Sequence, residues 1–394
     1  MNDDSGIDGV VDWLIGGAHS AATPDGVLNE MCERVVASGI PIWRVAAFIR
    51  TLHPEIMGRR LEWREGAGTT AHEASFAVFD SDAFRGSPVA RVYQEGEPLR
   101  VRLDTPATGE FPHLDELRAE GATDYLAVPF LFSNGEIHVG TWATRASGGF
   151  TEAQLSALHR VTEPLSRVAE IRALRRTAAN LLDTYVGREA GGRILAGQIR
   201  RGFSETIRAV IWLSDMRGFT ALADRIEPAA LIALLNRYFD CQVPAILAHG
   251  GEVLKFMGDG LLAIFPLGEG SDPPSVCRAA LAAATETRAA VAALDDWPRL
   301  APSAGPRFGL ALHVGELLYG NIGAARRLDF TCIGPAVNLA ARLESLTGRL
   351  GRTTLLSAEF AGHCGTGTVP LGEFALAGFR AKVPVFGLRD EMGL

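Results

Sequence analysis

The sequence predicts an α+β protein with two α/β domains joined by a long helix. Its 394 residues correspond to about two domains of roughly 100–200 residues each. Short apolar runs bounded by Gly and Pro occur in both halves, and a stretch with an apolar residue at every third or fourth position lies between them. We therefore expect a mixed α/β domain at residues 1–150, a helical connector at 151–200, and an α/β sandwich with an antiparallel sheet at 201–394.

The composition, with 47% apolar and 21% charged residues, is that of a soluble globular protein. The net charge of −8 argues against a nucleic-acid-binding protein, because such proteins carry a basic face. No apolar run approaches the ~20 residues that cross a bilayer, and the acidic start lacks a signal-peptide pattern, so we expect a cytoplasmic protein with no membrane span. The five scattered cysteines, with no CxxC pair, argue against a disulfide framework or a zinc site.

The N-terminal half shows one helical pattern and three strand patterns. Residues 26–38 have apolar residues at helical spacing, and residues 44–52, 124–132 and 136–144 read as strands. Six aromatic residues at or near such positions either line a pocket or fill the core: Trp43, Phe48, Trp63, Tyr125, Phe130 and Trp142.

The connector begins with a capping box formed by Thr151 and Gln154. Apolar residues then recur in steps of three or four from Leu155 to Tyr185, which makes one continuous stripe on a long helix. Such a stripe packs either onto its own N-terminal domain or against the same helix of a second copy, in parallel. The Gly-rich segment 187–202 reads as a linker.

In the C-terminal half, strands and helices alternate. Strands are expected at residues 208–215, 252–257, 261–265, 307–314 and 328–333. Helices are expected at 219–226, 228–248, 275–294 and 336–346, and the segment after 352 is strand-rich with one short helix.

Two aspartates stand at strand ends in this half. Asp215 follows an apolar strand and precedes a helix, and Asp259 lies in a Gly-Asp-Gly turn between two apolar strands. Taken singly, Asp215 is better explained as a helix cap, and Asp259 is better explained as part of a hairpin turn. If neighbouring strand ends bring them together, the two carboxylates suit Mg²⁺ or Mn²⁺, which binds one or two carboxylates plus substrate phosphates.

Asn338 and Arg342 stand four residues apart on one face of a predicted helix. An exposed Asn and Arg usually belong to a solvated helix surface. Beside a metal site, however, Arg342 can stabilise charge that develops on a phosphate oxygen.

These elements together resemble the class III nucleotidyl cyclases. The resemblance runs from about Ile207 to the C-terminus and rests on three stretches: LSDMRGFT, KFMGDG and GNIGAARRLDFTCIGPAVNLAARLE. It implies a ferredoxin-like α/β sandwich that cyclises a nucleoside triphosphate with two divalent metal ions, Mg²⁺ or Mn²⁺. The N-terminal half resembles a GAF-like sensor domain, which implies a regulatory role and an unidentified small-molecule or protein effector.

The resemblance also implies a role for each matching residue. Asp215, Asp259 and the Met216 carbonyl bind the metals, Asn338 orients the ribose, and Arg342 stabilises the transition state. The loop Gly218-Phe219-Thr220 and Arg326 bind phosphates, and Lys255 and Thr331 bind the purine. Lys with Thr favours adenine, because an ammonium donates to adenine N1 and a hydroxyl accepts from the exocyclic amine.

The resemblance therefore indicates an adenylyl cyclase, a phosphorus–oxygen lyase acting on ATP, with each site shared between the two chains of a homodimer. Two positions depart from the pattern: Ala377 stands where a phosphate-binding Lys is common, with Arg380 and Lys382 nearby, and Pro335 stands where Asp is common. The alternatives are a guanylyl cyclase and a nucleotide-binding regulator without turnover.

Overall fold

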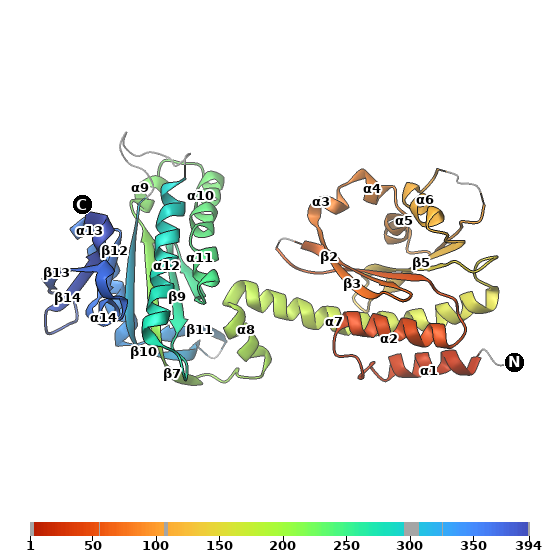
Figure 1. The fold of residues 1–394 in the computed structure, drawn as a ribbon, viewed down its shortest axis with the longest axis horizontal. Coiled ribbons are helices and arrows are strands. Elements are labelled where there is room, and N and C mark those ends of the chain that lie inside the picture. Colours follow the sequence, from red (N-terminus) through yellow and green to blue (C-terminus); the bar gives the residue numbers. More distant parts are fainter. Residues whose placement is uncertain (1–3, 55, 106–108, 295–306, 325, 393–394) are drawn as a thin grey trace. The chain divides into compact units, whose positions relative to one another are not determined.

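The computed structural model of the protein describes residues 4–54, 56–105, 109–294, 307–324 and 326–392 (Figure 1). The chain divides into an N-terminal unit, Met1–Leu181, and a C-terminal unit, Leu182–Leu394. Each unit is built on one sheet, so the predicted α+β class is confirmed.

The N-terminal unit has a six-stranded sheet in the order β3-β2-β1-β6-β5-β4, in which all neighbours are antiparallel. The predicted helix and the three predicted strands are confirmed. The strands are β1 (Arg44–Arg50), β2 (Ile56–Arg64), β3 (Gly68–Ser75), β4 (Leu99–Arg102), β5 (Asp124–Leu131) and β6 (Ile137–Thr144). The helices are α1 (Asp4–Ile15), α2 (Pro24–Ala37), α3 (Phe76–Phe79), α4 (Asp82–Arg85), α5 (Pro88–Glu95), α6 (Pro112–Ala119) and α7 (Glu152–Val186).

Helices cover both faces of this sheet. Successive side chains of β5 point to opposite faces, as the two-residue period of a strand requires. Leu126 and Val128 pack into the core formed with α1, α2 and α7. Tyr125 and Ala127 pack into the core formed with α5 and α6. The near-continuous apolar sequence of β5 follows from this burial on both faces.

Helix α7 begins with the predicted capping box. The Thr151 amide donates to Gln154 Oε1 at 3.0 Å, and the Gln154 amide donates to Thr151 Oγ1 at 3.2 Å. The apolar stripe divides along the helix. Leu158, Val161, Leu165 and Val168 are buried in the core of the N-terminal unit. The later stripe residues Ile171, Leu174, Leu181 and Tyr185 are exposed.

The C-terminal unit has an eight-stranded sheet in the order β13-β14-β12-β10-β7-β9-β8, with β11 pairing the far part of β10. Only β10 and β12 pair in parallel among the described strands. The strands are β7 (Ser204–Met216), β8 (Glu252–Met257), β9 (Gly260–Pro266), β10 (Phe308–Ala324), β11 (Arg327–Ile333), β12 (Thr354–Ser357), β13 (Thr368–Phe374) and β14 (Val383–Leu388). The helices are α8 (Arg188–Leu195), α9 (Phe219–Ala223), α10 (Pro228–Asp240), α11 (Val243–Ala248), α12 (Pro273–Ala292), α13 (Pro335–Leu350) and α14 (Ala358–Cys364).

The two faces of this sheet carry different helices. Val210 and Trp212 of β7 point into the core shared with α10, α11, α12 and α14. Ala209, Ile211 and Leu213 point to the other face, where α8 and the first turns of α13 pack. The tight turn between β8 and β9 is confirmed at Gly258-Asp259, where Met257 pairs with Gly260.

Three predicted elements differ from the structure. The helix expected at 228–248 is two helices, α10 and α11, because Pro244 near the start of α11 cannot donate a backbone hydrogen bond inside a continuous helix. The strand expected at 307–314 continues to Ala324 as it pairs with β7 and then β11. The Gly-rich segment expected as a linker contains α8, whose Ala190 is buried against the sheet.

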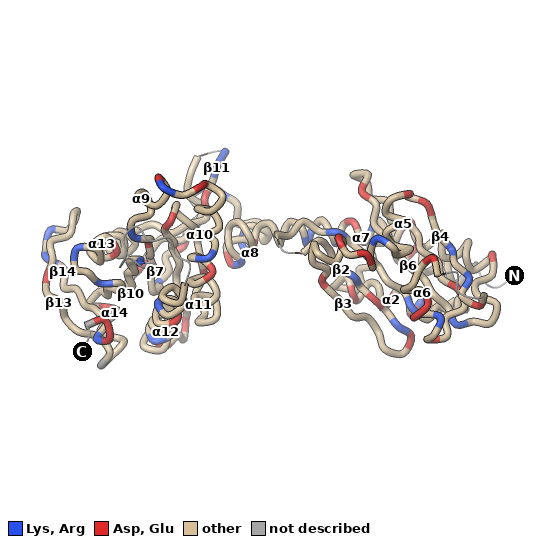
Figure 2. The backbone as a smooth tube through the Cα atoms, turned by 90° about the horizontal axis from the view of Figure 1, so that it is seen from above, with Lys and Arg blue, Asp and Glu red and all other residues tan. Residues whose placement is uncertain are grey.

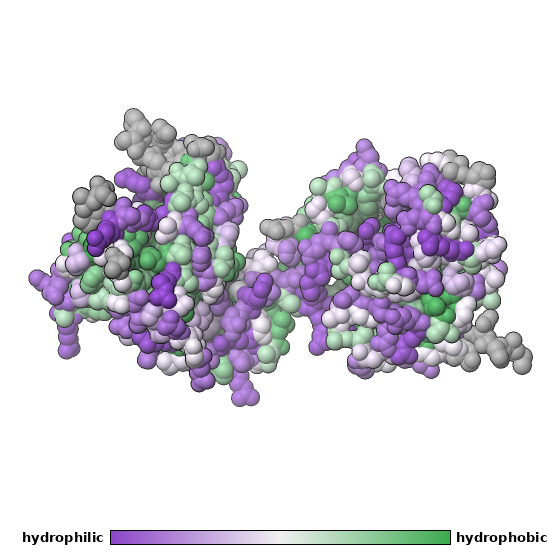
Figure 3. Space-filling view, in the orientation of Figure 1, coloured by the Kyte–Doolittle hydropathy of each residue, from purple (hydrophilic) through white to green (hydrophobic). Residues whose placement is uncertain are grey.

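Charged, polar and apolar residues are mixed in both units. Basic and acidic residues are interspersed along both units (Figure 2), and apolar surface is interspersed with polar surface on the visible face of each unit (Figure 3). Within the described ranges, no helix combines the length and the apolar character needed to cross a membrane.

Asp124 provides a test of the N-terminal unit. Its side chain is fully buried, accepts from Arg100 Nη2 at 2.8 Å and from the Phe150 amide at 3.0 Å, and so ties β4 and the start of α7 to β5. We expect Asp124→Ala to lower the free energy of unfolding of this unit by about 3 kcal/mol, because it leaves Arg100 without its buried partner. Urea unfolding followed by tryptophan fluorescence measures this change.

The matched control is Asp104→Ala, which removes the exposed ion pair with Arg102 and should leave the unfolding midpoint nearly unchanged. Equal effects of the two substitutions would contradict a structural role specific to Asp124.

Candidate active site

The structure brings Asp215 and Asp259 together. Asp215 is the penultimate residue of β7, and β7 pairs with β9 up to the pair Ser214 and Leu261. Asp259 lies in the turn that leads directly into β9, beside that end of β7. A β-carbon built on Gly260 would lie 3.1 Å from the Ser214 carbonyl and 3.2 Å from Asp215 Oδ1, so any other residue here would crowd the Asp215 carboxylate. Both carboxylates are half-buried.

The electrostatics of this pair favour a cation. Burial raises the pKa of Asp215 to about 6, and the neighbouring carboxylates of Asp259 and Glu344 add to the rise. Two carboxylates at one place repel each other, and a divalent cation between them removes that repulsion.

An ion pair lies directly beside the aspartates. Arg217 Nη2 donates to Glu344 Oε1 at 2.7 Å and to the Glu344 carbonyl at 2.9 Å, and it also contacts Thr347 Oγ1. Glu344 is 5% exposed. Burial raises the pKa of Glu344, and the Arg217 guanidinium opposes this rise. The pair fastens the segment just after Asp215 to α13.

This ion pair depends on Gly309 of β10, which pairs with Asp215 across the sheet. A β-carbon at position 309 would collide with Arg217 Nη2, Thr347 Oγ1 and Glu344 Oε1. The glycine therefore creates the space in which the ion pair forms.

The structure also brings Lys255 of β8 close to the segment of β11 that contains Thr331. β8 and β11 are in contact. Burial raises the pKa of the Cys332 thiol to about 11, and the Lys255 ammonium opposes this rise, which places Lys255 close to Cys332. Thr331 is 5% exposed, and its buried hydroxyl has no hydrogen-bond partner in the described part of the chain. Buried hydroxyls are normally paired, so a ligand atom is a natural partner here.

Asn338 and Arg342 lie one turn apart on α13 with exposed side chains. Within the described ranges, no hydrogen bond or ion pair joins either side chain to Asp215, Asp259 or another residue of the same chain. Both side chains are therefore exposed and unpaired within the described ranges.

Of the predicted phosphate-binding residues, Gly218, Thr220 and Arg326 are exposed and Phe219 is half-buried. Gly218 has φ 78° at the N-terminus of α9, so the chain turns there and the first amides of α9, at Phe219 and Thr220, have no acceptor within the helix. Arg326 is exposed in the turn between β10 and β11. Ala377 lies in an exposed loop together with Arg380 and Lys382.

The described residues contain no cluster of three or more His, Cys, Asp or Glu side chains placed to hold a metal ion. A metal bound at Asp215 and Asp259 would therefore complete its coordination with backbone and ligand oxygens, as Mg²⁺ commonly does. The Met216 side chain is buried, which leaves only its backbone available for the predicted role.

The sequence interpretation missed Arg217 and Glu344. Both lie inside stretches already singled out, LSDMRGFT and AARLE. The available signal was a charged residue next to a predicted metal ligand and an acid at the end of an otherwise apolar helix face. Their pairing joins positions 127 residues apart.

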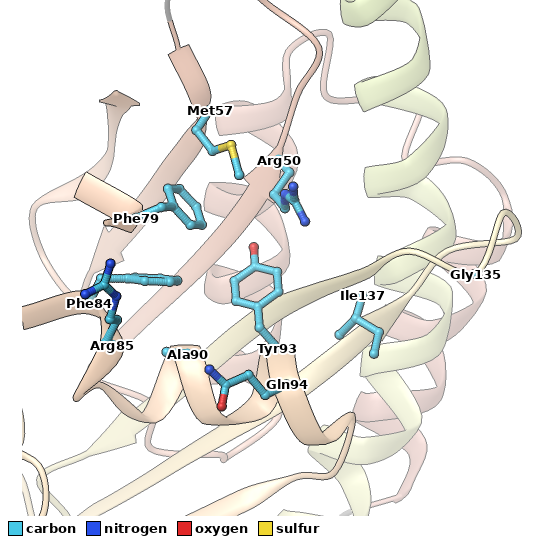
Figure 4. Close-up of a pocket in the computed structure, with 10 residues that line it drawn as sticks. All are labelled: Arg50, Met57, Phe79, Phe84, Arg85, Ala90, Tyr93, Gln94, Gly135 and Ile137. Atoms are coloured by element: carbon cyan, nitrogen blue, oxygen red, sulfur yellow. The ribbon is translucent and has the colours of Figure 1, made fainter. Parts of the chain in front are cut away.

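The N-terminal unit has a surface pocket of about 480 Å³ between the sheet and α3–α5. Figure 4 shows Phe79, Phe84 and Tyr93 turned toward one another in this pocket, with Arg50 at its edge. Of the six aromatics considered from the sequence, Trp43, Trp63, Tyr125, Phe130 and Trp142 are buried in the core, and Phe48 packs against it. None of these six residues lines the 480 Å³ pocket. We call it the aromatic pocket after Phe79, Phe84 and Tyr93, which line it.

Comparison with known proteins finds matches to the region that contains this site. Residues 204–359 match the family model of the adenylate and guanylate cyclase catalytic domain, which confirms the resemblance. This region contains Asp215, Asp259, Asn338 and Arg342.

The chain is 33% identical over 163 residues to an adenylate cyclase of Anabaena cylindrica, covering 40% of this chain and 31% of that protein. It is 32% identical over 155 residues to adenylate cyclase 1 of Rhizobium meliloti, covering 38% and 22%. The chain thus spans less than a third of the length of these relatives. The crystal structure of the adenylyl cyclase CyaB from P. aeruginosa superposes on 47% of this chain and 95% of that one, with 28% identity and a TM-score of 0.43.

Gly309 provides a test of the ion pair. We expect Gly309→Ala to lower the free energy of unfolding of the C-terminal unit by about 1–3 kcal/mol, because the added methyl group overpacks a site filled by mutually bonded side chains. The control is Gly362→Ala in α14, where a β-carbon meets no atom within 4 Å and helix propensity should improve slightly. Urea unfolding compares the two, and a stability loss at Gly362 equal to that at Gly309 would contradict the proposed packing.

Proposed function

We propose that the protein is an adenylyl cyclase that converts ATP to 3′,5′-cyclic AMP and pyrophosphate, because residues 204–359 match the model of the adenylate and guanylate cyclase catalytic domain. The observation that carries the proposal is the juxtaposition of Asp215 and Asp259 at adjacent strand ends, inside the matched region. In the reaction, the ribose 3′-oxygen bonds to the α-phosphorus, the bond from that phosphorus to the bridging oxygen of pyrophosphate breaks, and the 3′-hydroxyl proton is released.

The donor set fits two divalent ions, Mg²⁺ or Mn²⁺. Hard oxygen ligands are present, and burial together with the neighbouring carboxylates of Asp259 and Glu344 raises the pKa of Asp215. Bound ions would supply activation of the 3′-hydroxyl and charge neutralisation at the phosphates. The role of the chain is to hold the two carboxylates side by side, and the Arg217–Glu344 pair fixes the backbone that follows Asp215.

Lys255 and Thr331 would select the purine. The unpartnered Thr331 hydroxyl can accept from the exocyclic amine of adenine, and the nearby Lys255 can donate to N1. Guanine carries hydrogen on N1, which would leave the Lys255 ammonium facing a donor. This chemistry supports ATP over GTP, and a guanylyl cyclase is the alternative.

Arg342 would stabilise charge that develops on the α-phosphate, and Asn338 would orient the ribose. Charge-assisted hydrogen bonds from guanidinium to phosphate are among the stronger polar contacts. The free amides of Phe219 and Thr220 and the side chain of Arg326 would bind the terminal phosphates, with Arg380 or Lys382 in place of the lysine absent at Ala377.

We propose that each site is shared by two protomers. Asp215 and Asp259 would come from one chain, and Lys255, Thr331, Asn338 and Arg342 from the other. Exposed apolar side chains lie close to Lys255 and Thr331 in sequence and pairing: Phe256, Met257, Leu318 and Ile333. Exposed large apolar side chains of this kind mark interaction surfaces when they cluster. The N-terminal unit would act as a GAF-like regulatory domain for an effector.

The decisive assay incubates the purified protein with equal ATP and GTP, with Mn²⁺ or with a chelator, and identifies the products by mass. Cyclic AMP that forms only with metal supports the proposal. Predominant cyclic GMP would refute the purine assignment, and no cyclic product under any condition would indicate a regulator without turnover.

Complementation tests the shared site. Asp215→Ala or Asn338→Ala alone should lower the rate at least ~100-fold, because each removes a group from both sites of a symmetric dimer. Random mixing of the two variants should restore about a quarter of the wild-type rate, since half the dimers are mixed and each holds one intact site. The control mixes Asp215→Ala with Asp259→Ala, which leaves no intact site. Recovery in the control, or none in the first mixture, would contradict the geometry.

The purine assignment makes a separate prediction. The double substitution Lys255→Glu with Thr331→Cys should lower the ratio of ATP to GTP turnover at least ~10-fold, because two hydrogen bonds of about 1 kcal/mol each are lost for adenine. Lys382→Glu, the control at the only other lysine, should change both substrates alike. A ratio that stays constant in the double variant would exclude these residues as the purine-reading pair.

A further inference from the structure

A second cavity of the N-terminal unit lies between strands β1–β3 and the helices α2 and α7. Its volume is about 190 Å³, well above the ~10–15 Å³ that holds one water molecule, so it has room for a ligand of several heavy atoms. Its apolar wall includes Val27 and Leu28 of α2, Ile49 and Leu61 of the sheet, and Leu165 and Val168 of α7. We call it the α7 cavity.

Four arginines are among the residues that line this apolar space. Arg50, Arg59, Arg172 and Arg176 line the cavity, whereas Asp25 is the only acidic residue among the described lining residues. Arg59 is neutralised by Glu73, with 2.5 Å between their charged atoms.

Arg172 is held by neutral partners. Its guanidinium donates to the carbonyls of Ala22 at 2.8 Å and Ala21 at 2.9 Å, so its position is fixed while its charge stays uncompensated. Arg50 and Arg176 have exposed side chains, and neither forms an ion pair within the described ranges. The cavity therefore has a surplus of positive charge.

Thr51 adds a polar group without a partner. Its hydroxyl is buried, and no described residue forms a hydrogen bond with it, although Thr51 lines the cavity. A buried hydroxyl without a partner costs about 1–3 kcal/mol, and a ligand oxygen in the cavity would remove that cost.

We propose that the α7 cavity binds an amphipathic anion, namely a medium-length aliphatic chain with an anionic oxygen head group. The chain fills the apolar space, and the head group accepts hydrogen bonds from Arg172, Arg176 and the Thr51 hydroxyl. Guanidinium groups match both carboxylate and phosphate oxygens, so the shared chemistry is an oxyanion on an alkyl body.

The α7 cavity differs from the aromatic pocket because residues of α7 form part of its wall. Its wall includes residues of α7 from Leu165 through Arg172 and Arg176 to Asn180, which cover several successive turns of that helix. No α7 residue lines the aromatic pocket. A ligand in the α7 cavity thus touches the helix that continues into the C-terminal unit.

Calorimetric titration of the full chain tests the proposal with four probes. Octanoate should bind saturably at one site per chain. Octanol, which keeps the chain but lacks the charge, and acetate, which keeps the charge but lacks the chain, should each bind at least tenfold more weakly. Octyl phosphate distinguishes the head groups: tighter binding than octanoate identifies a phosphate head, and weaker binding identifies a carboxylate.

Two variants and a matched control locate the site. Arg176→Gln should weaken octanoate binding at least fivefold, and Ala173→Phe, which fills the cavity, should abolish it. Arg175→Gln removes a neighbouring exposed charge that does not line the cavity and should leave the affinity unchanged. Thermal unfolding verifies that each variant is folded. If Ala173→Phe does not fold, the binding result for Arg176→Gln decides the test.

Three results would overturn the proposal. They are the absence of saturable octanoate binding, equal affinity for octanol and octanoate, and equal weakening by Arg175→Gln and Arg176→Gln. None of these readouts depends on cyclase activity, so the α7 cavity is tested independently of the proposed function.

Discussion

The placement of two carboxylates side by side at Asp215 and Asp259 is the constraint on which the C-terminal unit depends. The sheet enforces it, because the pairing of β7 with β9 brings the end of one strand to the turn that precedes the other. Glycine at position 260 avoids a tight contact of a β-carbon with the Asp215 carboxylate. This placement makes ionisation of Asp215 unfavourable, because burial and the neighbouring acids raise its pKa to about 6. Without a bound cation, the repulsion between the two carboxylates destabilises the fold. Such destabilising arrangements are found mainly at active sites.

The charged groups next to Asp215 and Asp259 include a neutralising ion pair. Glu344 is a third acid near the pair, and Arg217 engages it through both its carboxylate and its carbonyl. Arg217 also lowers the pKa of Asp215, against the larger effects of burial and Asp259. The Arg217 guanidinium thus pairs mainly with Glu344, and the charges of Asp215 and Asp259 remain available to attract a cation. Gly309 makes this division possible, because any larger residue would displace the arginine.

Local patterns predicted three of the six strands of the N-terminal sheet and most strands of the C-terminal sheet. They also predicted the capping box at Thr151 and the turn at Asp259, because these features depend on neighbours in sequence. The Arg217–Glu344 pair was not predicted, since it joins residues 127 positions apart and arises only when α13 packs against the end of β7. The full length of β10 was missed for a related reason: its far part is stabilised by β11, and glycines such as Gly320 interrupt the apolar pattern where backbone from Phe203 approaches closely. The unpartnered hydroxyl of Thr331 likewise becomes meaningful only when burial is known.

The apolar stripe of α7 shows how one sequence pattern can serve two purposes. A straight helix of 35 residues is about 52 Å long, which is more than the core of the N-terminal unit covers. The first half of the stripe is buried there, ending at Val168, and the rest is exposed at Ile171, Leu174, Leu181 and Tyr185. With Ala178, these positions follow steps of 3, 4, 3 and 4, the a/d spacing of a two-stranded coiled coil. A catalytic site that needs two protomers requires a device that pairs them, and the same exposed stripe on a second chain would supply it. Packing onto the N-terminal unit is therefore confirmed for the first half of the stripe, and pairing with a second copy stays a prediction for the exposed half.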